Sequence, residues 1–230
     1  MSTPQHPCAD PTRYRDDLYW IYNALLSRYG PQHWWPADTP FEVMVGAVLT
    51  QNTSWINVER SIQALRDADH LHPTAIATAD HVALAAWLRP VGYFNVKARR
   101  LQDFCRWYLT QGEESRLAAL PTASLRAALL SVKGVGPETA DDMLLYAFGR
   151  PVFVIDAYTR RLLVRFGMAQ GDEPYEVLRT FFEEALDADA TIYNEYHALI
   201  VQHAKDTCRK RQARCSICPV SLRCPLSMGA

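Results

Sequence analysis

Apolar residues recur along most of this chain at the three- and four-residue spacing of amphipathic helices. The first such pattern runs from Tyr14 to Tyr29. The others cover, in chain order, residues 41–53, 55–67, 80–88, 96–110, 122–132, 137–148, 156–166, 174–186 and 191–205. Apart from the short stretch Val152–Ile155, no run alternates in the way that a sheet strand requires. The pattern therefore predicts an all-α fold.

The length and composition suit a globular protein with a substantial core. The 230 residues allow one large domain or two modest ones, and 49% of them are hydrophobic. No stretch approaches the roughly 18 apolar residues that cross a bilayer, and the first residues lack a signal-peptide pattern. We therefore expect a cytoplasmic protein without membrane association.

The net charge of −1 conceals a local excess of cations. The longest basic cluster holds a single acid, Asp206, and its cations are Lys205, Arg209, Lys210, Arg211 and Arg214. Two shorter clusters are Lys97, Arg99 and Arg100, and Arg160, Arg161 and Arg165. A basic face can bind phosphate even when the global charge is near zero, although most charge runs are simply solvated helix surfaces. The charge pattern alone leaves both interpretations open.

Four cysteines near the C-terminus carry the most specific chemical signal. They are spaced C-x6-C-x2-C-x5-C, at Cys208, Cys215, Cys218 and Cys224. Four thiolates can hold one Zn²⁺ or ligate a [4Fe–4S] cluster. Disulfides fit poorly, because a chain of this size needs no staples and shows no secretory signal. Zinc sites usually combine two Cys-x-x-Cys turns and only one is present, which favours the cluster.

A glycine-rich turn between two predicted helices is a second candidate site. One helix ends near Val132, Gly134-Val135-Gly136 forms a tight turn, and Pro137 suits the first turn of the next helix. The glycines let the backbone approach a partner closely, so the turn can bind phosphate without reading bases, while Val135 fills the core. Such a turn is weak evidence by itself, because any sharp connection between helices can use it.

Asp156 follows this turn by twenty residues and ends the apolar run Val152–Ile155. An acid at this point can cap the next helix through its carboxylate oxygen. A cap also fixes the geometry of the carboxylate, so capping and a catalytic role can coexist.

These features together resemble the helix-hairpin-helix DNA glycosylases of the endonuclease III superfamily. Besides the hairpin, Asp156 and the cysteine spacing, two segments match that family. Val48–Thr53 looks like the stretch whose glutamine, Gln51 here, enters the DNA helix beside the lesion. Val91–Ala98 looks like the Gly-x-x-x-x-Lys-Ala loop that wedges the opposite strand, with Tyr93 as the wedge.

The resemblance implies a two-domain architecture and a cofactor. A six-helix barrel with the hairpin would span residues 41–157, and residues 12–40 and 158–230 would form a second helical domain with a [4Fe–4S] cluster loop. The four cysteines would be the cluster ligands, and the substrate would lie between the domains. We expect a monomer that acts on double-stranded DNA containing a damaged base. The expected DNA contacts are Gly134, Val135, Gly136, Lys205, Arg209, Lys210 and Arg214.

One departure from the family alters the expected chemistry. Endonuclease III carries a lysine two residues after the second hairpin glycine, and this chain has Glu138 there. A carboxylate cannot form the Schiff base with the sugar that strand cleavage needs. We therefore place Asp156 and Glu138 at the catalytic site and expect Asp156 to be the residue that promotes the reaction. It would stabilise the developing positive charge on the sugar and orient a water, so that hydrolysis leaves an abasic site.

The segment His33–Pro36 and residue Glu138 resemble the 3-methyladenine DNA glycosylase branch of this superfamily. An N3- or N7-alkylated purine is cationic, and an aromatic pocket favours a desolvated cation by up to ~2 kcal/mol. Trp34 and Trp35 could stack on such a base, although adjacent tryptophans cannot both face one pocket. We expect one in the core and one in the pocket.

Two other functions stay open on sequence grounds. A bifunctional glycosylase/lyase for oxidised pyrimidines is favoured by the cysteine spacing and disfavoured by Glu138. A catalytically silent protein that binds damaged DNA is disfavoured by the retention of Asp156.

Overall fold

The computed structural model describes residue 8 and residues 10–228, and every regular element in that part of the chain is helical. The predicted all-α class is therefore confirmed. The stretch Val152–Ile155 is buried and has no regular secondary structure. Two compact units are formed. Unit 1 combines Met1–Trp34 with Pro151–Ala230, and unit 2 is the continuous segment Trp35–Arg150. The expected barrel bounds, 41–157, begin later and end later than those of unit 2.

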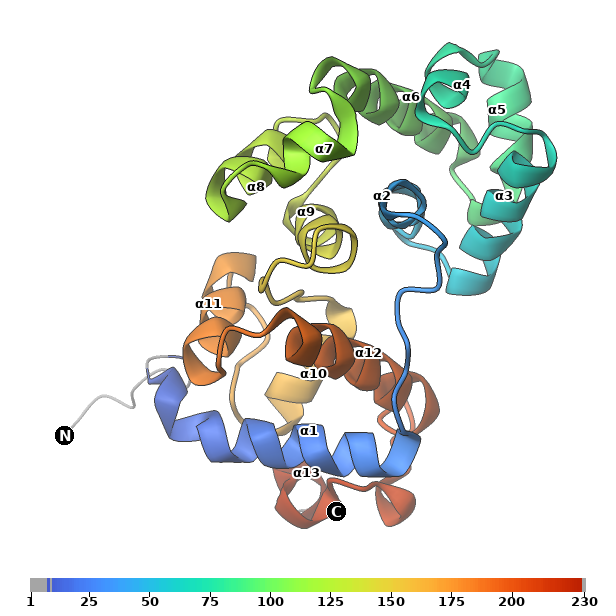
Figure 1. Cartoon of the computed structure of the whole chain (residues 1–230). Coiled ribbons are helices and arrows are strands. Elements are labelled where there is room, and N and C mark those ends of the chain that lie inside the picture. Colours follow the sequence, from blue (N-terminus) through green and yellow to red (C-terminus); the bar gives the residue numbers. More distant parts are fainter. Residues whose placement is uncertain (1–7, 9, 229–230) are drawn as a thin grey trace. The chain divides into compact units, whose positions relative to one another are not determined.

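Unit 2 is a bundle of helices, most of them short (Figure 1). Its elements are α2 (Pro40–Leu49), α3 (Trp55–Asp67), α4 (Pro73–Thr78), α5 (His81–Trp87), the 3₁₀ turn η3 (Arg89–Val91), α6 (Phe94–Thr110), α7 (Glu113–Ala118), α8 (Thr122–Leu130), α9 (Pro137–Asp142) and the π-helical turn η4 (Met143–Ala147). The sequence pattern did not predict α4 and α7, which are six residues each. Helices that short do not complete the repeat by which amphipathic segments are recognised.

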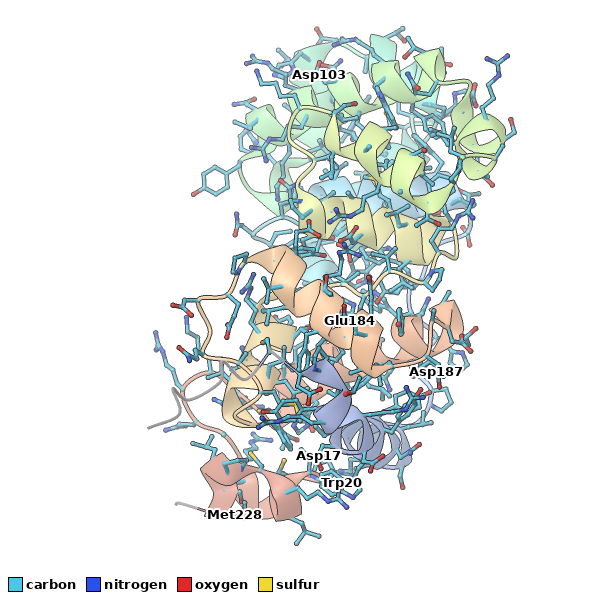
Figure 2. The ribbon with its side chains drawn as sticks, turned by 90° about the vertical axis from the view of Figure 1, so that its left-hand side faces the viewer. Asp17, Trp20, Asp103, Glu184, Asp187 and Met228 are labelled. Carbon is cyan, nitrogen blue, oxygen red and sulfur yellow. The ribbon has the colours of Figure 1, made fainter. Side chains whose placement is uncertain are left out.

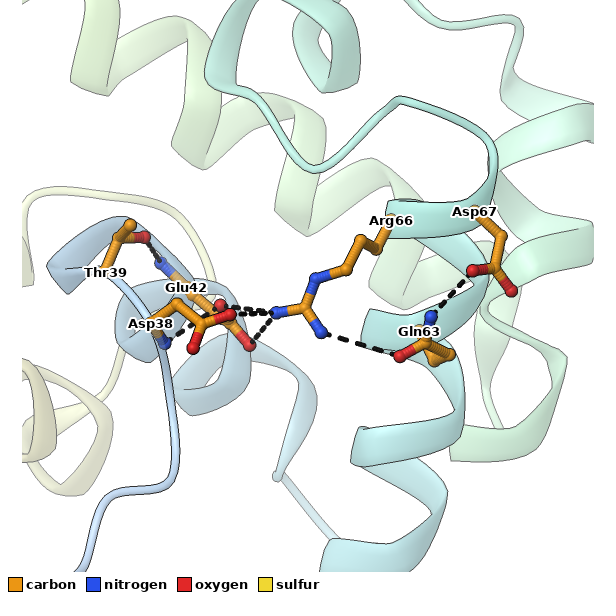
Figure 3. Close-up of polar contacts among 6 residues, drawn as sticks. All are labelled: Asp38, Thr39, Glu42, Gln63, Arg66 and Asp67. Carbon is orange, nitrogen blue, oxygen red and sulfur yellow. Dashed lines mark hydrogen bonds and ion pairs between the residues drawn. The ribbon is translucent and has the colours of Figure 1, made fainter.

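Helix α2 forms the centre of unit 2. Every residue from Phe41 to Leu49 is buried, and the helix contacts α3, α6, α9 and η4. A helix that is apolar all round is typical of such a central position. Its N-terminus is capped by Thr39, whose hydroxyl accepts the backbone N–H of Glu42 at 3.2 Å. The buried Glu42 carboxylate pairs with Arg66 of α3 at 2.9 Å, which fastens the two helices together (Figure 3).

Unit 1 is built around the long helix α12 (Ala190–Asp206), which packs against α1 (Arg15–Tyr29) and α10 (Ala157–Arg165). Its other elements are η2 (Pro11–Tyr14), α11 (Tyr175–Ala185), η5 (Cys215–Ile217), η6 (Ser221–Arg223) and α13 (Pro225–Met228). The core is aromatic: Phe153 stacks on Phe182 with ring centroids 3.9 Å apart, and Tyr196 meets both rings edge-on.

The C-terminal segment is attached to α1 through Arg223. This guanidinium donates to Asp17 at 2.9 Å and lies over the ring of Trp20, 4.7 Å from its centroid. Asp17 and Trp20 lie close together on α1 (Figure 2). The segment that carries the cysteines is thereby connected to the N-terminal helix.

Within the described residues, no helix combines the length and the apolar character needed to span a membrane.

Candidate active site and nucleic-acid interface

Asp156 in unit 1 is positioned by the buried segment that precedes it. The backbone N–H of Phe153 donates to Glu183 Oε1 at 3.0 Å, and that of Ile155 to the hydroxyl of Tyr175 at 3.4 Å. The side chains of residues 152–155 are buried, so the segment has little freedom to move. The apolar run seen in the sequence thus fixes the position of the carboxylate that follows it.

The carboxylate of Asp156 caps α10, as expected. Its Oδ1 accepts the backbone N–H groups of Tyr158 and Thr159 at 2.9 and 2.7 Å. Its Oδ2 lies 3.6 Å from Nε2 of His197 on α12. Burial acts to raise the pKa of Asp156, but His197 and the bonds at Thr159 outweigh it and hold that pKa below its ordinary value. The group is therefore an ionised, oriented carboxylate at neutral pH.

The hairpin of unit 2 joins α8 to α9, and Pro137 occupies the first turn of α9 as predicted. Val135 is 8% exposed, so its side chain fills the core and only its backbone is available to a partner. Gly134 has φ +92°, and a Cβ there would lie 2.8 Å from Cδ of Arg100. Gly136 has an ordinary φ and open space around the Cβ position. The first glycine is required by the fold, whereas the second leaves room for a close approach.

Gln51 is held against this hairpin. Its Nε2 donates to the carbonyl of Gly134 at 2.9 Å and to the hydroxyl of Thr139 at 3.1 Å, and its Oε1 accepts from Arg100 at 2.6 Å. One groove of unit 2, the Gln51 groove, is lined by Gln51, Asn52, Arg100, Gly134, Val135, Gly136, Glu138 and Thr139. The structure thus brings Gln51, Glu138 and the hairpin together.

Tyr93 is the most exposed of the predicted substrate residues. It is 77% exposed, precedes α6 and has φ +45°, a left-handed conformation that is uncommon for an aromatic residue. Its exposure agrees with a wedge, and its role stays a prediction.

Lys97 was assigned to a basic surface cluster, and this was wrong. The side chain is 3% exposed, and Nζ donates to the carbonyls of Leu49 at 3.0 Å and Val91 at 2.8 Å. Those carbonyls lie just before Gln51 and Tyr93, respectively. Burial, with Arg100 nearby, lowers the pKa of Lys97 to about 8. Lys97 connects the two loops internally and is not available to phosphate.

The two adjacent tryptophans belong to different units. Trp34 ends the first segment of unit 1, and Trp35 begins unit 2. Trp35 lies over Gly46 and contacts the rings of Trp55 at 5.0 Å and Tyr146 at 5.2 Å. Both tryptophans are partly exposed. The structure places Trp35 in an aromatic cluster whose other members were not singled out from the sequence.

The four cysteines line one pocket of unit 1. All four are free thiols, and Arg165 donates to the sulfur of Cys208 at 2.8 Å. His203 lies in the same pocket, where burial and the nearby Arg165 lower its pKa to about 4 and leave the imidazole neutral. In the described part of the chain, no three His, Cys, Asp or Glu side chains form a group that could hold a metal ion. The number and type of these donors nevertheless match a [4Fe–4S] cluster, in which each iron takes one thiolate.

The basic residues of unit 1 divide into two groups. Lys205, Arg209, Lys210, Arg211 and Arg214 are exposed around the first cysteines, as a phosphate contact requires. The cluster of Arg160, Arg161 and Arg165 instead faces the protein itself. Arg160 donates to the carbonyl of Glu173, and both Arg161 and Arg165 bind the cysteine segment at Cys208.

A hairpin between two helices, followed along the chain by a capped, partly buried aspartate, is the arrangement of a helix-hairpin-helix DNA repair glycosylase. Residues 45–188 match the HhH-GPD superfamily of base excision DNA repair proteins. The chain belongs to this superfamily, which confirms the resemblance inferred from the motifs.

Three related proteins illustrate the match. The chain is 47% identical over 210 residues to the "Putative DNA repair glycosylase MJ1434" of Methanocaldococcus jannaschii, covering 90% of this chain and 95% of that protein. It is 31% identical to the 3-methyladenine DNA glycosylase MagIII of H. pylori bound to 1,N6-ethenoadenine, with a TM-score of 0.70 and coverage of 85% and 97%. A non-covalent endonuclease III–DNA complex shares the fold, with a TM-score of 0.81, 18% identity and coverage of 94% and 97%.

One residue beside Asp156, His197, was not singled out from the sequence, and Lys97 was noted but placed on the surface. His197 lies on the apolar face of α12, and Lys97 lies inside unit 2. A helical projection of residues 190–206 could have indicated His197, because Tyr193, Tyr196 and Ile200 share its buried face. Nothing in the local sequence marks Lys97 as buried.

Proposed function

We propose that this glycosylase removes an alkylated purine such as 3-methyladenine from double-stranded DNA by hydrolysis alone. The observation that carries the proposal is Asp156, a partly buried and ionised carboxylate fixed by two backbone N–H groups. As the glycosidic bond breaks, positive charge develops on the sugar, and a preorganised anion stabilises it without reorganisation. The same carboxylate would orient the attacking water.

The absence of a lyase step is proposed from Glu138. It occupies the position that resembles the Schiff-base lysine of endonuclease III, and it lines the Gln51 groove with an exposed side chain. A carboxylate has no amine with which to attack the sugar C1′, so the product would be an intact strand with an abasic site. The likeness to a 3-methyladenine glycosylase at 31% identity supports the choice of base.

The other site residues are assigned by the same reasoning. Tyr93 and Gln51 would fill the space left by the extruded nucleotide, and an indole of Trp34 or Trp35 would stack on the flipped base. The hairpin backbone would bind phosphate. Lys205, Arg209, Lys210 and Arg214 would bind further phosphates, and a [4Fe–4S] cluster on the four cysteines would hold their loop in place.

The test is base release from duplexes that carry 3-methyladenine, 7-methylguanine or thymine glycol, analysed with and without alkali treatment. We expect methylpurine release with strand breaks only after alkali, and a fall of roughly 10²–10⁴-fold for Asp156→Asn. Asp189→Asn is the matched control, because Asp189 also caps a helix of unit 1 through two backbone N–H groups. Its base release should stay at the wild-type level.

Two results would change the assignment. Breaks at thymine glycol without alkali would restore the glycosylase/lyase function, and borohydride would then trap the wild-type protein on DNA. We expect trapping only in Glu138→Lys, which reinstates an amine at that position. Binding to lesion DNA without release of any base would identify a damage-binding protein.

A further inference from the structure

The two oxygens of Asp156 have different surroundings. Oδ1 accepts two backbone N–H groups and is committed to capping α10. Oδ2 makes neither of these bonds and lies 3.6 Å from Nε2 of His197. That separation is within ion-pair range but is longer than a direct hydrogen bond. The oxygen that His197 faces is therefore the one available for chemistry.

Both side chains are largely withdrawn from solvent, with 7% of His197 and 14% of Asp156 exposed. A carboxylate in such a position is costly to keep ionised unless a partner compensates for its lost hydration. Lys205, on the same helix as His197, interacts with Asp156 electrostatically but has an exposed side chain. On α10, the guanidinium groups of Arg160 and Arg161 are directed to the carbonyls of Glu173 and Cys208.

We infer that His197 is the positioning residue for Asp156: it orients Oδ2 and keeps the carboxylate ionised in its buried setting. This inference rests on the proposed catalytic role of Asp156. His197 itself would touch neither the base nor the sugar. Its effect would be exerted through the carboxylate, in the way that a buried partner orients a catalytic group and favours one protonation state.

A purely structural role for His197 makes different predictions. The imidazole shares the buried face of α12 with Tyr193, Tyr196 and Ile200, so it also fills space. If it only filled space, replacing it would lower stability and would leave the ionisation of Asp156 unchanged. If it positions the carboxylate, the acid limb of the activity profile must move.

The first readout is base release from methylpurine duplexes across mildly acidic to neutral buffers, for wild type, His197→Leu and His197→Gln. For His197→Leu we expect a loss of roughly 10-fold at neutral pH. The acid-side half-point should rise by about 1 pH unit. His197→Gln, which keeps a donor, should recover part of the neutral-pH rate. Gln202→Leu, an exposed position on the same helix, is the control.

The second readout is independent of activity. Carboxyl ¹³C NMR of aspartate-labelled protein, with the Asp156 signal assigned by Asp156→Asn, reports the pKa of Asp156 directly. We expect that pKa to rise in His197→Leu and to stay in place in Gln202→Leu. An unchanged Asp156 pKa together with an unshifted activity profile would overturn the inference. If the pKa moves but no variant or wild type releases a base, the proposed function fails while the role of His197 stands.

Discussion

The hairpin of unit 2 and the cysteine loop of unit 1 (residues 208–224) are both proposed to contact DNA, and they are built in opposite ways. In the hairpin, Val135 is buried and Gln51 and Arg100 are bound to each other and to the turn. The turn can therefore contact DNA mainly through its backbone N–H groups. Around the cysteine loop the cationic side chains are exposed, whereas Arg161 and Arg165 of α10 donate hydrogen bonds to Cys208 in the loop.

The difference separates two kinds of binding energy. Cationic side chains that neutralise phosphates release counterions, so their contribution weakens as salt rises. A backbone turn contributes through shape and N–H direction, and its contribution depends on the turn keeping its conformation. The hairpin should therefore respond to changes of backbone geometry and the loop to changes of charge.

The largest effect is expected from removing the exposed charges. Replacing Lys205, Arg209, Lys210 and Arg214 together by glutamine should make the negative slope of log K against log salt shallower by roughly 3–4, because each phosphate contact contributes about 0.9 to its magnitude. Duplex binding measured at several salt concentrations gives the slope. Arg28→Gln, an exposed charge on α1, should leave it unaltered. An unchanged slope in the fourfold variant would remove the loop from the interface.

The hairpin glycines should respond unequally. Gly134→Ala places a Cβ against Arg100 at φ +92°, and we expect a loss of ~2–4 kcal/mol in unfolding free energy. Gly136→Ala meets open space at an ordinary φ, so it should unfold like wild type and yet bind duplex more weakly, with an unchanged salt slope. Denaturant unfolding and binding on the same samples test both. Wild-type binding by Gly136→Ala would show that DNA does not approach there.

Lys97→Met tests whether a buried cation contributes to stability and not to DNA binding, because Lys97 donates its hydrogen bonds to carbonyls inside the protein. Two buried carbonyls lose their donor, and we expect a loss of ~1–2 kcal/mol in unfolding free energy at neutral pH. Burial lowers the folded-state pKa of Lys97 to about 8, whereas an unfolded lysine titrates near about 10.4, so the unfolded chain binds more protons between these values. Wild-type stability should therefore gain from this group as pH rises through that window.

That gain should be absent in Lys97→Met, and the salt slope of DNA binding should match wild type. Denaturant unfolding at a series of pH values measures the first property. A shallower salt slope in this variant than in wild type would mean that Lys97 reaches phosphate after all.

The smallest effect is expected at Gly46. An added Cβ would lie 3.0 Å from the Trp35 indole, which must shift by a few tenths of an ångström. The strain of that shift is offset by the gain of about 1 kcal/mol that alanine has over glycine inside a helix, so the net change in unfolding free energy should be small. If Trp35 stacks on the flipped base, Gly46→Ala should reduce the preference for methylated over normal purines without changing duplex affinity. Equal discrimination by this variant and by Trp35→Ala, both matching wild type, would assign stacking elsewhere.

The sequence predicted those structural features that are determined by residues close together in the chain. The longer helices follow from their apolar repeat, the start of α9 from Pro137, and the cap of α10 from Asp156 after four apolar residues. The cysteine spacing anticipated a shared pocket. Such features are set by contacts within a few positions along the chain.

Features set by tertiary packing were missed or misassigned. From the sequence, Lys97 is interpreted as a surface cation, but in the fold it lies between the carbonyls of two loops. Arg161 and Arg165 are likewise interpreted as phosphate contacts, but in the fold they bind Cys208. His197 carries no motif at all. In each case the deciding partner lies far away along the chain, where spacing rules do not reach.

Unit 1 is discontinuous in the chain, and unit 2 is one unbroken segment within it. During synthesis, all of unit 2 has emerged once Arg150 has been added, and it can fold at that point. The apolar face of α1, formed by Leu18, Ile21 and Leu25, can be buried only when α12 has been synthesised, more than a hundred residues later. Helix α1 thus leaves the ribosome early and is buried late, and in the interval its apolar face is exposed to aggregation.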